Sequence, residues 1–179
     1  MRCFIAIDID KGFRNKIVEI QERIKSTDAN VKFVEPENLH FTVKFIGDVN
    51  ENELEAIKHS LNFLKNEHSF KIVIGGVGYF GGPNYIRTLW VGIKDGEDEM
   101  KDIMKKVNFH VRFGEREASP HLTIGRVKSG KNLENLTRLI GQCKDVNIGE
   151  MDVKEIKLKS SVLTAKGPVY DDISTFALR

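Results

Sequence analysis

A chain of 179 residues, of which 40% are hydrophobic and 30% charged, is long enough to bury one sizeable core. Its formal net charge of +2 excludes a general nucleic-acid coat, so an anionic ligand would need a local cluster of side chains. The N-terminal "MRCFIAIDIDKG" predicts no signal peptide, and no segment approaches the roughly 20 apolar residues of a membrane span. Cys3 and Cys143 fit neither a zinc spacing nor a disulfide framework. We therefore expect a soluble, cytoplasmic protein that does not bind membranes.

The spacing of apolar residues predicts strands and helices that alternate along the chain. In the first half, the expected strands are residues 2–9, 31–49 (broken at Pro36) and 69–80, and the expected helices are residues 12–26 and 51–68. In the second half, the expected strands are residues 87–93, 120–127, 146–153, 155–164 and 168–178, and the expected helices are residues 96–111 and 132–143. Both halves therefore begin with the same order of strand, helix, strand, helix and strand.

This repeated order predicts an α+β fold. We expect a bilobal molecule in which two pseudo-symmetric antiparallel sheets, backed by helices, surround a central cleft. Residues 1–179 would form a single domain of two similar lobes, approximately 1–80 and 85–179, with the option that strands are exchanged between them. The joint is expected near the turn-rich "YFGGPNY" (79–85).

Two strands carry the same polar motif. "LHFTVKFIGD" (39–48) contains His40 and Thr42, and "PHLTIGRV" (120–127) contains His121 and Thr123. On a strand, residues two apart project from the same face, so each motif presents one imidazole beside one hydroxyl. A single copy would ordinarily be structural, because threonine favours strands. The second copy at an equivalent place favours a functional interpretation.

Two such pairs facing each other across a cleft would form a phosphate-binding site. Threonine hydroxyls can donate to phosphate oxygens, and imidazoles exchange protons near neutral pH. One neutral histidine would take a proton from the nucleophile, and one protonated histidine would give a proton to the leaving oxygen. This chemistry requires no metal and no cofactor, and it predicts cleavage of a phosphoester.

Three further residues are candidates for contacts at the cleft. Strict alternation places Lys44 on the His40 face, where it would add positive potential or lie solvated at the rim. Contact with a nucleobase would need an aromatic ring near the cleft. Phe80 and Tyr85 are candidates by position, with packing in the core or between the lobes as the alternative.

The motif stretches "NLHFTVKFIGDV" and "SPHLTIGRVK", together with "MRCFIAIDI", "RTLWVGI" and "LKSSVLTAKGPVY", resemble a known family. This family is the RNA 2′,3′-cyclic phosphodiesterases, also called 2′-5′ RNA ligases, which belong to the two-histidine phosphoesterase superfamily. The resemblance covers nearly the whole chain. It implies a bilobal catalytic domain that hydrolyses a terminal 2′,3′-cyclic phosphate to a 2′-phosphomonoester, with reversible 2′-5′ ligation as a side activity.

The resemblance also implies roles for the motif residues. His121 would be the general base that activates water, and His40 the general acid that protonates the departing O3′. Thr42 and Thr123 would hold phosphate oxygens.

The family pattern also places Arg126 on the phosphate. Strict alternation from His121 puts this side chain on the opposite face of the strand. Gly125 would permit a bulge or strand end that re-aims it. The alternative is an exposed arginine at the end of a strand.

The resemblance implies RNA with 2′,3′-cyclic phosphate ends as the partner, tRNA fragments and short oligonucleotides included. We expect the protein itself to be a monomer. Two alternatives remain open. The chain could hydrolyse another 2′-5′ or cyclic nucleotide ester, or it could be a module that binds nucleotides or terminal phosphates without turnover.

Overall fold

A computed structural model of the chain describes residues 1–116 and 119–179. Its helices are α1 (Lys11–Lys25), α2 (Glu51–Ser60), α3 (Glu97–His110) and α4 (Leu133–Gln142), with 3₁₀ helices η1 (Pro36–Asn38) and η2 (Leu61–Asn66). Its strands are β1 (Arg2–Asp8), β2 (Val31–Phe33), β3 (His40–Asp48), β4 (Phe70–Gly82), β5 (Tyr85–Asp95), β6 (Glu115–Arg116), β7 (Leu122–Val127), β8 (Asn147–Val153), β9 (Glu155–Thr164) and β10 (Gly167–Ala177). These elements confirm the α+β class.

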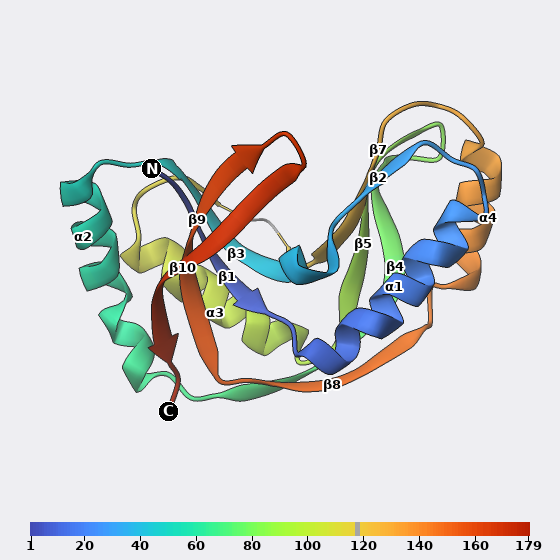
Figure 1. Cartoon of the computed structure of the whole chain (residues 1–179). Coiled ribbons are helices and arrows are strands. Elements are labelled where there is room, and N and C mark those ends of the chain that lie inside the picture. Colours follow the sequence, from blue (N-terminus) through green and yellow to red (C-terminus); the bar gives the residue numbers. More distant parts are fainter. Residues whose placement is uncertain (117–118) are drawn as a thin grey trace.

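All the strand pairs are antiparallel and form one curled sheet in the order β10-β9-β1-β3-β7-β5-β4-β8, with β2 paired to β7 and β6 to β3. In the described part of the chain, β3 and β7 pair only through Phe41 and Leu122. The sheet bends at this narrow connection, and Figure 1 shows a lobe on each side of it. The expected bilobal arrangement is confirmed, with the two sheets joined into one.

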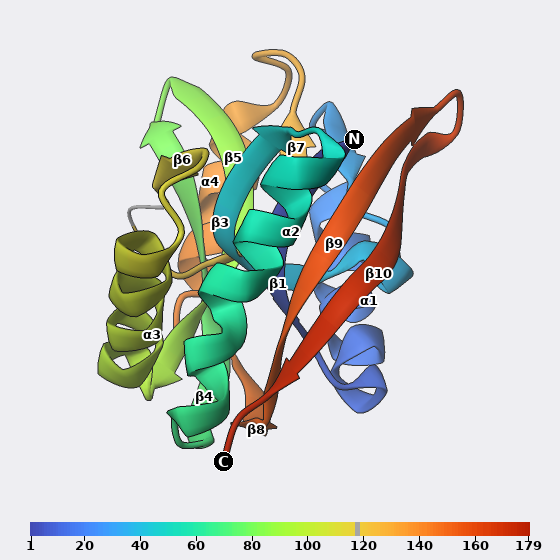
Figure 2. The ribbon, with the colours of Figure 1, turned by 90° about the vertical axis from the view of Figure 1, so that its left-hand side faces the viewer.

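Each lobe is backed by two of the helices. Figures 1 and 2 show α2 and α3 on the lobe that contains β1, β3, β9 and β10, and α1 and α4 on the other lobe. The inward faces are apolar at helical spacing, as in α1, where Ile17, Ile20 and Ile24 are buried. None of the described helices is long and apolar enough to span a bilayer.

The halves of the sequence do not coincide with the lobes. Strand β4 lies in the second lobe, whereas β9 and β10, at the end of the chain, lie in the first. The stretch 79–85 is also not a joint. Gly82 pairs with Tyr85, so Pro83 and Asn84 form the tight turn of a hairpin inside the second lobe. The expected position of the joint was wrong because a hairpin turn and a linker have the same composition.

Candidate active site

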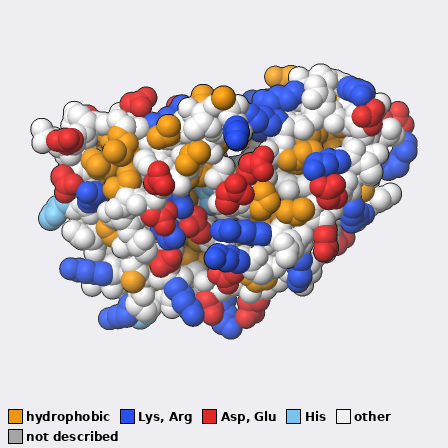
Figure 3. Space-filling view, in the orientation of Figure 1, with side chains coloured by type: hydrophobic (Ala, Val, Ile, Leu, Met, Phe, Trp, Pro, Cys, Tyr) orange, Lys and Arg blue, Asp and Glu red, His pale blue; other side chains and the backbone are white. Residues whose placement is uncertain are grey.

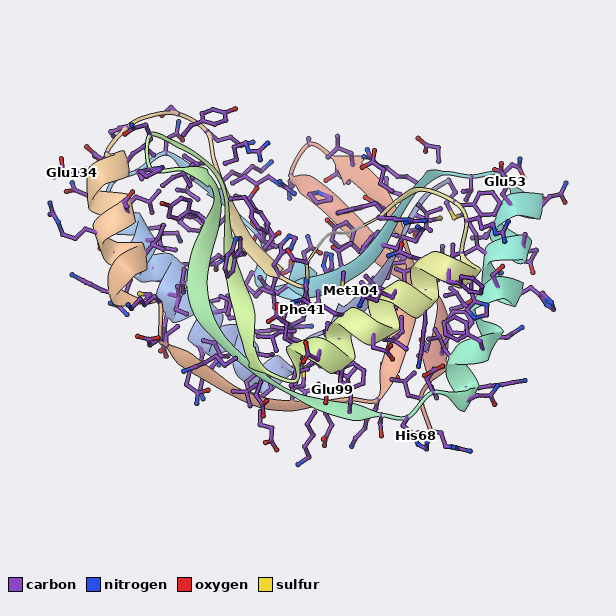
Figure 4. All side chains as sticks on the ribbon, turned by 180° about the vertical axis from the view of Figure 1, so that it is seen from behind. Phe41, Glu53, His68, Glu99, Met104 and Glu134 are labelled. Carbon is purple, nitrogen blue, oxygen red and sulfur yellow. The ribbon has the colours of Figure 1, made fainter. Side chains whose placement is uncertain are left out.

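The two His-x-Thr motifs meet where the lobes join. Phe41 lies between His40 and Thr42, and it pairs with Leu122, the middle residue of the second motif. Figure 4 shows Phe41 at the centre of the molecule, between the lobes. Both apolar side chains are buried, so the polar residues on either side of them project from the other face of the sheet.

The four polar residues line one cavity of about 450 Å³. It is lined by His40, Thr42, His121 and Thr123. This volume lies within the range of about 300–1,000 Å³ that is typical of small-molecule sites. The structure therefore brings the motifs together around a space that can accommodate a nucleotide.

The two imidazoles are held in the same way. His40 Nδ1–H donates to the carbonyl oxygen of Asn38 at 2.7 Å, and His121 Nδ1–H donates to that of Ser119 at 2.9 Å. Each acceptor lies two residues before its histidine. Because Nδ1 keeps its proton for this bond, the neutral ring has its lone pair on Nε2. In His40, Nε2 lies 3.0 Å from the hydroxyl oxygen of Thr42.

Aromatic rings lie against both histidines. The ring of His40 lies 5.1 Å from that of Phe4 and 5.6 Å from that of Tyr170, measured between centroids. The ring of His121 makes an edge-to-face contact with Phe80, at 4.7 Å between centroids. These contacts restrict the orientation of each imidazole. Phe80 also lines the cavity.

The protonation of His40 is set by its surroundings. Burial lowers the pKa of His40, and the positive charge of Lys159 and the imidazolium form of His121 act in the same direction. The hydrogen bond to Asn38 and the carboxylate of Asp8 oppose this shift without cancelling it. The neutral form of His40 is therefore favoured in the free protein.

A β-bulge brings Arg126 to the cavity. Along β5, Trp90 pairs with Thr123 and Leu89 with Gly125, so Ile124 is an extra residue in β7. The faces of β7 exchange at this point. Arg126 lines the cavity, and its Nη1 lies 3.5 Å from Thr88 Oγ1. The bulge considered from the sequence thus exists, one residue before Gly125.

Strand β3 carries a matching bulge, which corrects the expectation for Lys44. Val43 is the extra residue against β1, at the same distance from its histidine as Ile124. Beyond it, Phe45 lines the cavity and is 44% exposed. Lys44 is 2% exposed and donates to Asn108 Oδ1 of α3 at 2.8 Å. The placement of Lys44 on the His40 face was therefore wrong.

Of the two aromatic candidates, Phe80 lines the cavity and Tyr85 does not. The cavity lining also includes residues that sequence reasoning missed. Tyr85 is 69% exposed at the tip of the β4–β5 hairpin and does not line the cavity. Tyr170 does line it, although its only signal was its place in "TAKGPVY". Three basic residues also line the cavity: Lys32, Lys128 and Lys166. Figure 3 shows Lys and Arg side chains gathered on the upper edge, where the lobes meet.

Within residues 1–116 and 119–179, no group of three or more His, Cys, Asp or Glu side chains is arranged to hold a metal ion.

The model of the family described as "LigT like Phosphoesterase" matches residues 7–90 and, separately, residues 91–170. The chain therefore belongs to the LigT-like phosphoesterases and is an enzyme of that class. The resemblance inferred from the motifs is confirmed at this level.

Relatives and solved structures agree with this assignment. The chain is 44% identical to an RNA 2′,3′-cyclic phosphodiesterase of Methanothermobacter thermautotrophicus, over 99% of each chain. It is 42% identical to a protein of the same name from Methanocaldococcus jannaschii, over 97% of this chain and 98% of the relative. A solved structure from Thermus thermophilus has a TM-score of 0.81 at 25% identity, covering 100% of this chain and 98% of that one. E. coli LigT complexed with 3′-AMP shares the fold, with a TM-score of 0.79 at 19% identity and coverage of 99% and 97%.

Proposed function

We propose that this phosphoesterase hydrolyses the terminal 2′,3′-cyclic phosphate of RNA to a 2′-phosphomonoester by acid–base catalysis that needs no metal ion. The observation that carries the proposal is the pair of imidazoles, each fixed through Nδ1 so that Nε2 is left for one shared cavity. The names of the two archaeal relatives support the substrate. Short oligonucleotides and tRNA fragments with such ends, bound by a monomer, are the expected substrates.

The reaction needs one proton taken and one proton given. His121 Nε2 takes a proton from water, and the resulting hydroxide attacks phosphorus. The bond from phosphorus to O3′ breaks, and O3′ receives the proton from His40 Nε2. The product is a 2′-phosphomonoester with a free 3′-hydroxyl. Arg126 and the hydroxyls of Thr42 and Thr123 stabilise the charge on the nonbridging oxygens.

The contact between His40 and Thr42 couples protonation to phosphate binding. In neutral His40, Nε2 accepts the hydroxyl proton of Thr42. When His40 is protonated, Nε2–H becomes a donor and the hydroxyl proton of Thr42 is free for a phosphate oxygen. The negative phosphate in turn raises the pKa of His40. Substrate binding thereby converts a neutral imidazole into the acid that the reaction requires.

Ligation is the same chemistry with a different nucleophile. If the 5′-hydroxyl of a second RNA occupies the position of water, the same proton transfers form a 2′-5′ linkage. Water is far more concentrated than RNA ends, so hydrolysis dominates unless the second RNA is held in place. We therefore propose ligation as a minor, reversible activity.

The test uses an oligonucleotide with a 2′,3′-cyclic phosphate end, incubated with the protein in EDTA, followed by mapping of the product. We expect a 2′-phosphate end at an undiminished rate. Loss of activity on chelation would contradict the metal-free mechanism. A 3′-phosphate product would contradict the assignment of O3′ as the leaving group, and tightly bound but intact RNA would indicate a binding module.

The same assay examines the two histidines through matched variants. His40→Ala and His121→Ala should each lower kcat by roughly 10²–10⁴-fold, the range for loss of a general acid or base. His59→Ala, on the exposed face of α2, is the control and should retain full activity. Near-full activity in either motif variant would show that the two-histidine scheme is incorrect.

A further inference from the structure

A second cavity lies beside the first, on the other side of His40. Its volume is about 520 Å³. The two cavities share His40, Phe45, Pro168 and Tyr170, whereas His121 and Thr123 line only the first. A ligand bound at the two motifs can therefore continue past His40 into a separate space.

The lining of this second cavity has the groups that a nucleotide needs. Arg2 provides a guanidinium for a phosphate, and Ser161 provides a hydroxyl. Phe45, Leu163 and Tyr170 offer apolar surface for a base. Phe45 and Leu163 are 44% and 80% exposed, so their apolar surfaces are accessible to a base.

The charged side chains around Tyr170 indicate where in the second cavity a phosphate would bind. Burial raises the pKa of Tyr170, and the positive charges of Arg126 and Arg2 oppose this shift. The Tyr170 side chain therefore lies within the fields of both arginines, one lining each cavity. Glu115 also lines the second cavity, and its carboxylate would repel a phosphate. A linking phosphate is therefore expected on the Arg2 side.

The direction of the RNA follows from the stereochemistry of displacement. The attacking and leaving oxygens lie roughly in line on opposite sides of phosphorus. With water at His121, O3′ lies toward His40. The ribose carries both O2′ and O3′, so it must also lie on the His40 side. The chain then continues from the 5′ carbon of this ribose to the preceding phosphate, away from His121 and toward the second cavity.

We propose that the second cavity is a subsite for the RNA nucleotide that precedes the cyclic phosphate end. Arg2 binds the linking phosphate, and the base packs against Phe45 and Leu163. The subsite rests on the proposed function, because the direction of the chain depends on which histidine serves O3′. It makes the enzyme prefer an oligonucleotide over a cyclic mononucleotide.

The test compares kcat/KM for a 2′,3′-cyclic mononucleotide with that for a dinucleotide that ends in the same cyclic phosphate. The wild-type protein should prefer the dinucleotide. Arg2→Ala should reduce this preference by roughly 10- to 150-fold, as expected for loss of one charged hydrogen bond to a phosphate. It should also reduce the salt dependence of kcat/KM for the dinucleotide by about one unit of log–log slope. Arg2→Lys, which keeps the charge, should recover part of the preference.

Arg138→Ala is the matched control, since Arg138 lies on the surface of α4 and pairs only with Glu134 within the described residues. It should leave the preference and the salt slope unchanged. Equal kcat/KM for the two substrates in the wild type, or an unchanged preference in Arg2→Ala, would overturn the subsite while leaving the proposed function intact. Failure of the wild type to hydrolyse either substrate would instead overturn the proposed function and the subsite with it.

Discussion

The surroundings of His40 differ from those of an exposed histidine in three ways. Its Nδ1 is bound to a backbone carbonyl, its ring lies against Phe4 and Tyr170, and burial lowers its pKa. As the general acid of the proposed mechanism, His40 needs the opposite, a proton at working pH. The substrate must therefore raise the pKa of His40. A bound phosphate anion does so, because its negative charge offsets the effect of burial and favours the imidazolium.

Charged residues near His40 also shift its pKa. Asp8 pairs with His40 in the strand register, and its carboxylate raises the pKa of His40. Lys159, only 8% exposed, bonds Asp172 at 2.6 Å and Asp8 at 3.1 Å. Its charge lowers the pKa of His40. The ion pair thus places one charge of each sign near the imidazole, and the effect of Asp8 on the pKa of His40 is the larger of the two.

The pKa of His40 can be measured by NMR titration of its ring proton, assigned with the His40→Ala variant. We expect a pKa below about 6.5, the usual value for histidine, so the free protein loses the proton of His40 before neutral pH. Added inorganic phosphate should raise the pKa. Lys159→Met, which removes a nearby positive charge at similar side-chain length, should also raise it. A value at or above that of an ordinary histidine in the free protein would show that burial does not control the protonation of His40.

At the scale of elements, the bulges in β3 and β7 determine which side chains of these strands line the cavity between the motifs. Val43 and Ile124 each lie three residues after a histidine, and each bulge exchanges the faces of its strand. The residues five positions after the histidines are Phe45 and Arg126, and both line the cavity. The pseudo-symmetric positions therefore carry an aromatic ring on one lobe and a cation on the other.

The β4–β5 hairpin supports His121 through a chain of ring contacts. The indole of Trp90 lies over Gly78, where a Cβ would come within 2.4 Å of its ring atoms. Trp90 contacts Phe80 at 5.6 Å between centroids, and Phe80 contacts His121. The absence of a side chain at Gly78 is therefore a requirement for the position of the His121 imidazole.

Gly78→Ala should displace Trp90 and, through Phe80, His121. We expect a loss of about 1–3 kcal/mol in the free energy of unfolding, as for other overpacked sites, and a lower kcat. Trp90 is the single tryptophan of the chain, so its fluorescence should change directly. Gly82→Ala on the same strand is the control, because a Cβ there meets nothing within 4 Å. Equal stability and equal fluorescence for the two variants would contradict this requirement.

The sequence was sufficient for most of the elements and for the first residues of each motif. It missed β6 and the change from α-helix to 3₁₀ helix after Ser60, and it failed where pairing between distant strands decides the structure. Alternation correctly placed Thr42 beside His40 and Thr123 beside His121, because period-two spacing is local. It failed at Lys44 because a bulge depends on the register of β3 against β1. The joint at 79–85 was misplaced for a related reason, since composition marks a turn but not the partners of the strands on either side.

On the scale of the whole molecule, the path of the chain ties the lobes together. The polypeptide passes from β3 in the first lobe to β4 in the second, and from β8 in the second to β9 in the first. Helix α1 follows β1 of the first lobe but packs on β7 and β8 of the second. Neither lobe is therefore a continuous stretch of sequence, and neither half of the chain contains all the strands of one lobe.

This connectivity predicts that the two lobes unfold together. Trp90 fluorescence reports on β5 in the second lobe, whereas far-UV circular dichroism reports on the helices and strands of both. In a denaturant titration the two signals should show one transition with coincident midpoints, as expected for a cooperative unit. If Trp90 lost its native signal at a distinctly lower denaturant concentration, the second lobe would be an independent unit. His40 and His121 would then lie on two separately stable lobes, and the proposed acid–base mechanism would need another explanation for how they are held together.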